Sequence, residues 1–150
     1  MGQYCHGNEP SHHVVYLLRY AGREARQAEL VRDVFEKFYV NKPDGLCGND
    51  DCGQMSAWYL FSAMGFYPMN PASGEYVLGA PQLPKIVLHL PTYTGKTFTV
   101  LAKNLSAENK YVKSVARNGV PLEGFTIRHE DILEGGELVF EMTGTPPRIE

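Results

Sequence analysis

The sequence lacks a long apolar run, since no stretch approaches the roughly 18 to 20 residues that a helix needs to cross a bilayer. It also lacks an excess of basic residues: 14 lysines and arginines stand against 17 aspartates and glutamates, a net charge of -3. This balance argues against a nucleic-acid partner, because binding of that kind neutralises phosphates with a basic surface. The 150 residues, 43% of them hydrophobic, have the composition of one globular domain able to bury a core.

Cysteine is scarce, with Cys5, Cys47 and Cys52 as the three in the chain, so they cannot all pair within it. Cys47 and Cys52 are close enough in sequence to bridge, although the bridge would close a very short loop. Three histidines lie near Cys5 in the sequence, at His6, His12 and His13. A zinc site is the alternative, but neither C-x2-C nor H-x3-H spacing is present, and free or buried thiols are the favoured interpretation.

The stretch Cys47–Trp58 places an asparagine and two aspartates between glycines, at Asn49, Asp50 and Asp51. The apolar residues of the run that follows are spaced like the buried face of a helix: Met55, Trp58, Leu60, Phe61 and Met64. Asp50 and Asp51 therefore fall at a helix entry, where free N–H groups and the helix dipole favour a carboxylate cap. A helix cap needs one carboxylate, so the other aspartate is available for catalysis, and the flanking glycines would let a substrate approach it closely. A helix cap and a catalytic site both remain possible interpretations of this stretch.

Apolar spacing predicts three helices in the first half of the chain, over about residues 11–20, 24–39 and 53–64. Gly22 and Gly65 are expected to end the first and the third. The second carries an apolar stripe that we expect in the core, formed by Leu30, Val31, Val34, Phe35 and Phe38. Trp58 and Tyr59 are expected to be core residues, with one of them lining a pocket as the alternative.

After Pro68 the sequence changes to short β-rich runs separated by turn residues. Six strands are predicted, at Glu75–Leu78, Lys85–Leu90, Thr97–Ala102, Tyr111–Arg117, Phe125–Arg128 and Glu137–Met142. Asn118-Gly119 predicts a hairpin turn. The polar corner at residues 129–131, His129-Glu130-Asp131, is expected to be a solvated loop rather than a binding site.

Helices followed by strands predict an α+β fold. We divide the chain into a helical part, residues 1–67, and a β-rich part, residues 68–150. The residues that point to chemistry all lie in the helical part, and three helices rarely form a deep site alone.

Two polar segments, His6–His13 and Gly48–Trp58, followed by Gly65–Pro68 and Asn70–Gly74, closely resemble the C-terminal part of glycoside hydrolase family 92. Members of that family are calcium-dependent exo-acting α-mannosidases, so the resemblance implies mannose-containing glycans as the substrate. It covers essentially the whole chain. The fold that it implies is the last helices of an (α/α)6 barrel followed by a β-rich C-terminal segment.

The resemblance implies an inverting hydrolysis, in which one carboxylate activates water and a separate carboxylic acid protonates the leaving oxygen. The water-activating aspartate of the family matches Asp51. A neighbouring position helps to hold the water, and either Asp50 or Asn49 occupies it. The basicity of the pair is in question if a carboxylate is required there and Asn49 takes the place.

The segment at Asn8 and Glu9 resembles the part of the family site that meets the sugar and the calcium. Oxygen-rich side chains suit this hard cation, so Asn8 and Glu9 are the calcium ligands and sugar contacts that the resemblance implies. His12 and His13 would face the substrate or lie directly behind it. Two ordinary helix caps are the alternative interpretation of the two polar segments.

Family members are several times longer than this chain. The resemblance therefore implies that the N-terminal part of a parent protein, with the general acid, precedes Met1, and that this part is a partner of the chain. We expect the 150 residues alone to be inactive. The compartment is not indicated by the sequence, although the family is typically exported in bacteria.

Two other classes of function are open. In a non-catalytic carbohydrate-binding module, the β-rich half would present aromatic platforms, with Tyr93, Tyr111 and Phe125 as candidates that are more readily core or rim residues. In a scaffold, a helical barrel cut across its middle would expose apolar faces such as the Val34/Phe35 stripe and self-associate.

Overall fold

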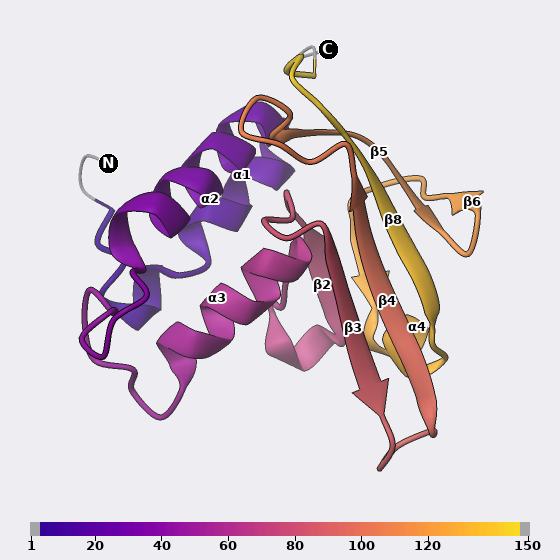
Figure 1. Ribbon diagram of the computed structural model, residues 1–150, viewed down its shortest axis with the longest axis horizontal. Helices are drawn as coiled ribbons and strands as arrows, with labels where there is room; N and C mark the ends of the chain where they lie inside the picture. The colour runs from indigo at the N-terminus through magenta and orange to yellow at the C-terminus, as the bar shows by residue number, and fades with distance from the viewer. Residues whose placement is uncertain (1–3, 148–150) are drawn as a thin grey trace.

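The computed structural model describes residues 4–147, in which a layer of helices packs against a β-rich part (Figure 1). The helical layer contains α1 (Val14–Tyr20), α2 (Glu24–Phe38) and α3 (Gln54–Met64), preceded by the 3-10 turn η1 (Glu9–Ser11). The three predicted helices are thus confirmed, although the first begins at Val14. Pro10 and the Ser11 hydroxyl, which donates to the Asn8 carbonyl oxygen at 2.7 Å, instead favour the separate turn η1.

The strands form two sheets. A three-stranded antiparallel sheet has the order β1-β2-β7, with β1 (Phe66–Tyr67), β2 (Glu75–Leu78) and β7 (Thr126–Arg128). A five-stranded sheet has the order β3-β4-β8-β5-β6, with β3 (Lys85–Leu90), β4 (Lys96–Lys103), β8 (Gly136–Thr143), β5 (Tyr111–Arg117) and β6 (Val120–Pro121). Strands β4 and β8 run parallel, and the other neighbours are antiparallel. All six predicted strands are confirmed, and the fold is a mixed α and β one.

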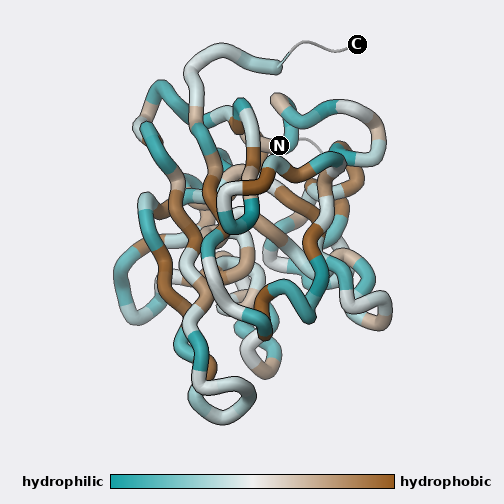
Figure 2. The backbone as a smooth tube through the Cα atoms, turned by 90° about the vertical axis from the view of Figure 1, so that its right-hand side faces the viewer, coloured by the Kyte–Doolittle hydropathy of each residue, from teal (hydrophilic) through white to brown (hydrophobic). Residues whose placement is uncertain are grey.

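Short elements complete the chain: η2 (Pro71–Ser73) and α4 (His129–Leu133), together with the two-residue strands β1 and β6. The predicted hairpin turn joins β5 to β6, and Asn118 and Gly119 both have positive φ, at 49° and 81°. Figure 2 shows that hydrophobic segments run through the middle of the molecule, while the loops around them are mostly hydrophilic. No helix within residues 4–147 is long and apolar enough to span a membrane.

The interior contains two clusters of buried apolar side chains. One lies between the sheets and the helices and includes Phe66, Leu78, Phe98, Leu138 and Phe140. The other lies among the helices and β1 and includes Val15, Tyr16, Val31, Val34, Trp58 and Tyr67. The two parts are also joined at the rim, since the Tyr111 hydroxyl on β5 donates to the Glu29 carboxylate on α2 at 3.0 Å. Whether residues 1–67 and 68–150 are separate domains stays a prediction.

Two predicted features of the apolar faces are wrong. Val34 is fully buried and Phe35 half-buried, so the stripe named for self-association is not an exposed one. Leu60 was predicted on the buried face of α3, yet it is 60% exposed, whereas Met55 and Trp58 are fully buried. Helical spacing marks the apolar side of a helix, but the neighbouring elements decide how much of that side is covered.

The aromatic residues proposed as glycan platforms do not form one. Tyr111 is buried in the core, and Phe125 packs edge-on against Tyr20 with ring centroids 4.9 Å apart. Tyr93, at 76% exposure, stands alone on the loop between β3 and β4. The structure therefore gives no support to a carbohydrate-binding surface made of these three side chains.

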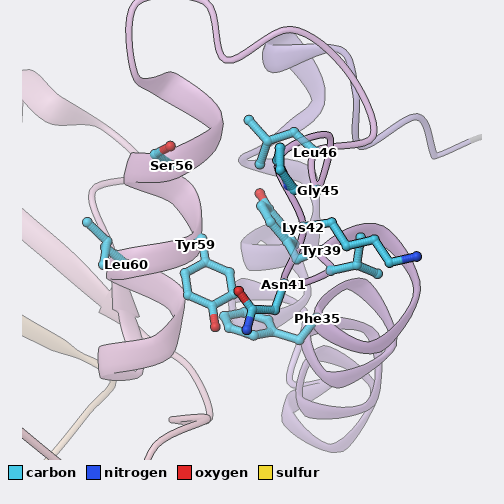
Figure 3. A pocket seen from close by; sticks show the side chains of 11 residues that line it. Phe35, Tyr39, Asn41, Lys42, Gly45, Leu46, Ser56, Tyr59 and Leu60 are labelled. Atoms are coloured by element: carbon cyan, nitrogen blue, oxygen red, sulfur yellow. The ribbon is translucent and has the colours of Figure 1, made fainter.

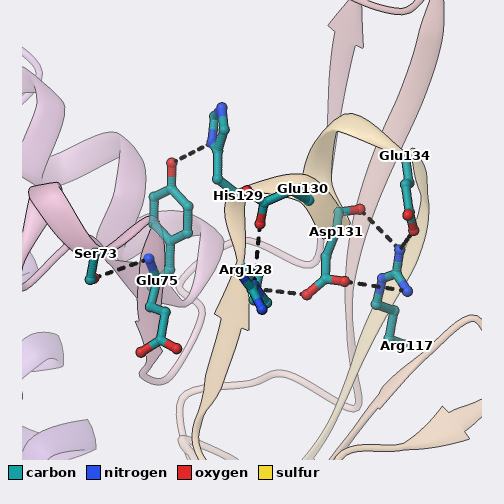
Figure 4. Close-up of polar contacts among 9 residues, drawn as sticks. Ser73, Glu75, Arg117, Arg128, His129, Glu130, Asp131 and Glu134 are labelled. Carbon is teal, nitrogen blue, oxygen red and sulfur yellow. Dashed lines mark hydrogen bonds and ion pairs between the residues drawn. The ribbon is translucent and has the colours of Figure 1, made fainter.

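The polar corner at residues 129–131 is the short helix α4, so the prediction of a loop is wrong (Figure 4). The Asp131 carboxylate accepts a hydrogen bond from the Arg128 backbone N–H at 2.8 Å, which caps the helix. Arg117 pairs with Asp131 at 3.5 Å and with Glu134 at 2.6 Å. These contacts hold α4 to β5 and account for the acidic residues of the corner.

Candidate active site

Two loops from distant parts of the sequence meet at a pair of glycines. A Cβ atom on Gly7 would lie 2.9 Å from the carbonyl oxygen of Cys47, and one on Gly48 would lie 2.8 Å from that of Gly7. Real Cβ atoms essentially never approach backbone atoms this closely, so the contact requires glycine on both sides. The contact joins the segment that leads into η1 to the segment that leads into α3.

This contact brings Glu9 and Asp51 together. The pKa of the Asp51 carboxyl is raised from its usual value, first by the negative charge of Glu9 and by a hydrogen bond between the two side chains. Slight desolvation and the charge of Asp50 add to the shift. Two carboxylates this close favour retention of a proton between them. The Asp51 side chain is exposed to solvent, so the pair can exchange protons with water.

Asp50 has a different role in the structure. Its Oδ1 accepts a hydrogen bond from the Ser56 N–H at 2.9 Å, and its carbonyl oxygen accepts one from the Met55 N–H at 3.2 Å. Both donors belong to the first turn of α3, so the capping interpretation is confirmed for Asp50. Asp51 has a left-handed backbone, with φ at 45°, and its side chain takes no part in the cap of α3.

The other predicted site residues lie on the same two loops or at the start of α1. Asn8, His13 and Asn49 are exposed. His12 is 1% exposed; its Nε2–H donates to the His6 carbonyl oxygen at 2.9 Å, and its carbonyl oxygen accepts from Trp58 Nε1 at 3.1 Å. His12 therefore lies behind the site, not at its surface. Sugar binding by these residues stays a prediction.

His6 is a structural centre that the sequence interpretation did not assign. Its Nε2 is 2.7 Å from the Tyr39 hydroxyl and its Nδ1 is 2.8 Å from the Tyr4 hydroxyl. Because Tyr39 donates its own proton to the Met55 carbonyl oxygen, His6 Nε2–H is the donor and Nδ1 accepts from Tyr4. Burial, followed by the charge of His12, lowers the pKa of His6 from 6.5 to about 3. A neutral imidazole thus anchors the loop before Glu9.

Gln54 connects this network to a cavity beside Glu9. Its Nε2 donates to His12 Nδ1 at 3.2 Å and to the Tyr67 hydroxyl oxygen at 3.3 Å. The cavity has a volume of about 340 Å³, and its walls are Glu9, Gln54, Ala57, Phe61, Tyr67, Pro68, Met69 and Pro71. Tyr67 and Gln54 were missed as site residues, although Gln54 belongs to the polar stretch before α3. Nothing in the local sequence of Tyr67 marks it, because its place at the cavity depends on β1.

A larger cavity, of about 670 Å³, lies between the end of α2, the loop after it and α3 (Figure 3). Its walls include Tyr59, Leu60, Phe35 and Asn41. The expected core position is therefore confirmed for Trp58, whereas Tyr59 lines a pocket, which was the alternative. No carboxylate lines this cavity. We therefore take the smaller cavity, with Glu9 in its wall, as the candidate site.

Few side chains near the candidate site are placed to coordinate a metal ion. Within residues 4–147, no group of three or more histidine, cysteine or acidic side chains is placed to hold a zinc or calcium ion by itself. Glu9 Oε1 is buried and has no hydrogen-bond partner among the described residues. A buried carboxylate oxygen without a partner, near the Asp51 carboxylate, would supply part of the shell of a hard cation such as calcium.

Replacing Gly48 with alanine should separate the two loops. The new Cβ would meet the backbone of Gly7, which cannot yield as a side chain can, so we expect a loss of about 1–3 kcal/mol in the free energy of unfolding. The pKa of Asp51 should fall toward its usual value as Glu9 moves away, and an NMR titration of the carboxyl carbons measures this. Asn49→Ala, on the same loop, is the control. An unchanged Asp51 pKa in folded Gly48→Ala would contradict the proposed loop contact.

Comparison with known proteins identifies relatives of this arrangement. Residues 1–144 match the model of the glycosyl hydrolase family 92 catalytic domain. Over 134 residues the chain is 35% identical to an uncharacterized secreted glycosidase of Arthroderma benhamiae, an alignment that covers 88% of this chain and 17% of that protein.

Solved structures agree with the sequence match. A family GH92 α-mannosidase of Bacteroides thetaiotaomicron in complex with mannoimidazole is 42% identical, with a TM-score of 0.91 over 97% of this chain and 19% of that one. A family GH92 inverting mannosidase of the same organism is also 42% identical, with a TM-score of 0.86 over 97% of this chain and 20% of that one. The chain thus spans about a fifth of the length of these relatives. With a family match over nearly its whole length and the same fold, this chain belongs to glycoside hydrolase family 92.

Proposed function

We propose that the chain forms the water-activating side of an inverting, exo-acting α-mannosidase that hydrolyses terminal α-linked mannose. The observation that carries the proposal is the pairing of Asp51 with Glu9 at the rim of a cavity, with the pKa of Asp51 raised. The names of the solved relatives, α-mannosidase and inverting mannosidase, support the substrate class and the stereochemical course.

In this proposal Asp51 is the general base. A carboxylate whose pKa is raised toward neutrality removes a proton from water more effectively than one with an ordinary pKa, provided that it is ionised when water arrives. The adjacent charge of Glu9 has this effect on Asp51. Asp50 is held at the start of α3 by its cap, so it supports the backbone beside the base and leaves Asp51 exposed.

The proton donor for the leaving oxygen comes from elsewhere. In inverting enzymes the acid and the base stand about 6.5–9.5 Å apart, so that water fits between the base and the sugar. The charge of Glu9 acts on Asp51 more strongly than that of any other group, so we take the two to be neighbours, closer together than an acid and a base of this kind. We infer that the acid belongs to another part of a longer protein, in which α1, α2 and α3 are the last helices of an (α/α)6 barrel.

The base assignment is tested in a protein of the relatives' length that contains this sequence. Asp51→Ala should lower the rate of mannose release from an aryl α-mannoside by about 1,000-fold or more, with the circular dichroism spectrum unchanged. Asn49→Ala is the neighbouring control and should retain much more activity. Full activity of the Asp51 variant would reject the assignment. The 150 residues alone should release no mannose, and measurable turnover by them would reject the inferred external acid.

We also propose calcium as the cofactor, with Glu9 and Asn8 of this chain among its ligands. Bound calcium would grip mannose hydroxyls and favour the distorted sugar ring, while Glu9 and Asn8 fix its position. Since these residues supply only part of a shell of six to eight oxygens, the chain alone should bind calcium weakly, with a Kd of about 1 mM. Titration calorimetry measures this, and Glu9→Gln should weaken binding further. Micromolar binding, or binding indifferent to Glu9→Gln, would contradict the ligand assignment.

A further inference from the structure

The three cysteines all lie on the two loops that form the candidate site. Cys5 precedes the Gly7 contact, Cys47 precedes Gly48, and Cys52 follows Asp51. All three are free thiols with exposed side chains, so each is open to reagents in solution. None of them is used by the proposed hydrolysis.

The glycine contact brings Cys5 and Cys47 together. Cys47 is covalently next to Gly48, and its own carbonyl oxygen is the atom that a Cβ on Gly7 would meet first, at 2.9 Å. Cys5 is held within one turn of Gly7, because its carbonyl oxygen accepts hydrogen bonds from the Asn8 N–H at 3.2 Å and the Ser11 hydroxyl at 2.5 Å. The two cysteines therefore lie on opposite sides of one backbone contact.

Electrostatic effects agree with this placement. Partial desolvation raises the pKa of the Cys47 thiol, a backbone hydrogen bond opposes this, and the charge of a Cys5 thiolate raises it further. The pKa of the Tyr4 phenol is raised by burial and then by Tyr67, Cys47 and Cys5. Salt screens the effect of distant charges on exposed groups, so these effects agree with a neighbouring placement of Tyr4, Cys5 and Cys47.

We propose that Cys5 and Cys47 are a disulfide-forming pair, whose bond ties the loop that carries Glu9 to the loop that carries Asp51. The proposal rests on the loop contact and does not depend on the proposed function. A bond between Cys47 and Cys52 is disfavoured, because it would close a small ring over Asp50, which is fixed at the Ser56 N–H, and Asp51, whose backbone is left-handed.

The bond forms by thiol–disulfide exchange with a small disulfide such as oxidised glutathione. One thiolate attacks a glutathione sulfur and releases one reduced glutathione; the second thiolate then attacks the mixed disulfide and releases another. The two cysteines lose two electrons and two protons in total, and one glutathione disulfide is reduced to two thiols. Because the pKa of Cys47 is raised, the reaction should be slow at neutral pH and faster in mild alkali.

The test equilibrates the purified chain with oxidised glutathione at pH 8.5 and counts free thiols after unfolding. We expect the count to fall from 3 to 1. A protease that cuts before aspartate separates Cys47 from Cys52 at Asp50 and Asp51, so mass spectrometry of the digest identifies the pair. The Cys52→Ser variant should still form the bond, whereas Cys5→Ser and Cys47→Ser should not.

Thermal unfolding gives a second readout. A bond that closes a loop of about 40 residues should raise the unfolding midpoint of the oxidised Cys52→Ser variant by about 10 °C over its reduced form. Three remaining thiols, glutathione adducts without an internal bond, or a bond to Cys52 would each overturn the proposal. A Cys5–Cys47 bond that lowers the midpoint would overturn the claim that the native loops bring the two thiols together.

Discussion

Replacing Trp58 with alanine should lower the free energy of unfolding by about 3–5 kcal/mol, the largest effect that we expect from a single substitution in the helical layer. Trp58 is fully buried, and its indole ring meets the rings of His6 edge-on at 4.3 Å and Tyr39 in a parallel stack at 6.2 Å. Its Nε1–H is also the donor to the carbonyl oxygen of His12. Removal leaves both a cavity and an unsatisfied buried carbonyl group.

The measurement is urea unfolding followed by far-ultraviolet circular dichroism, since the variant loses the single tryptophan of the chain. Leu60→Ala is a matched control on the same helix. Its side chain is 60% exposed, so the loss should be about 0.5 kcal/mol or less. Equal losses in the two variants would contradict the orientation of α3 described above.

Acid should destabilise the protein through His6, by about 2 kcal/mol between pH 6.5 and pH 5. The pKa of His6 is lowered to about 3 in the folded chain, against 6.5 when it is unfolded. Below pH 6.5 the unfolded chain therefore binds a proton that the folded chain does not, and stability falls as the pH falls. The stabilisation is complete above pH 6.5 and continues to decline down to about pH 3. His12, whose pKa burial also lowers, acts in the same direction.

Chemical denaturation across this pH range, compared between the wild-type chain and His6→Asn, isolates the contribution of His6. The variant should be less stable at pH 7, because the buried hydrogen bonds to Tyr4 and Tyr39 are weakened, but its stability should depend less on pH. His13→Ala, at an exposed neighbouring histidine, is the matched control variant. An NMR titration that gives His6 a pKa near 6.5 would contradict the buried, neutral state.

The local elements followed from the sequence because each depends on nearby residues. Alternation of side chains and turn residues such as Asn118-Gly119 placed all six longer strands, and the glycines after Tyr20 and Met64 marked helix ends. The shorter elements were missed for the same reason. Strand β1 exists only because it pairs with β2, and α4 depends on the Asp131 cap and on Arg117 from a distant strand.

At the candidate site, the sequence identified candidate residues but not the role of each. Residue type, the position before a predicted helix and the resemblance singled out Asp50, Asp51 and Glu9, but they left open which carboxylate caps α3. The structure assigns the cap to Asp50 and places Asp51 beside Glu9. It also buries His12 behind Gln54, so that Gln54 and Tyr67 face the cavity in its place.

The sequence by itself determined the order of the longer helices and strands, the family and the acidic residues proposed for the site, because these follow from local patterns and from matched segments. Only the tertiary structure decided which of those residues meet. Glu9 and Asp51 stand far apart in the chain, and their contact depends on two glycines whose missing side chains let two backbones touch. The close contact between these two backbone segments exists only in the folded protein, and it cannot be read from the sequence around either glycine.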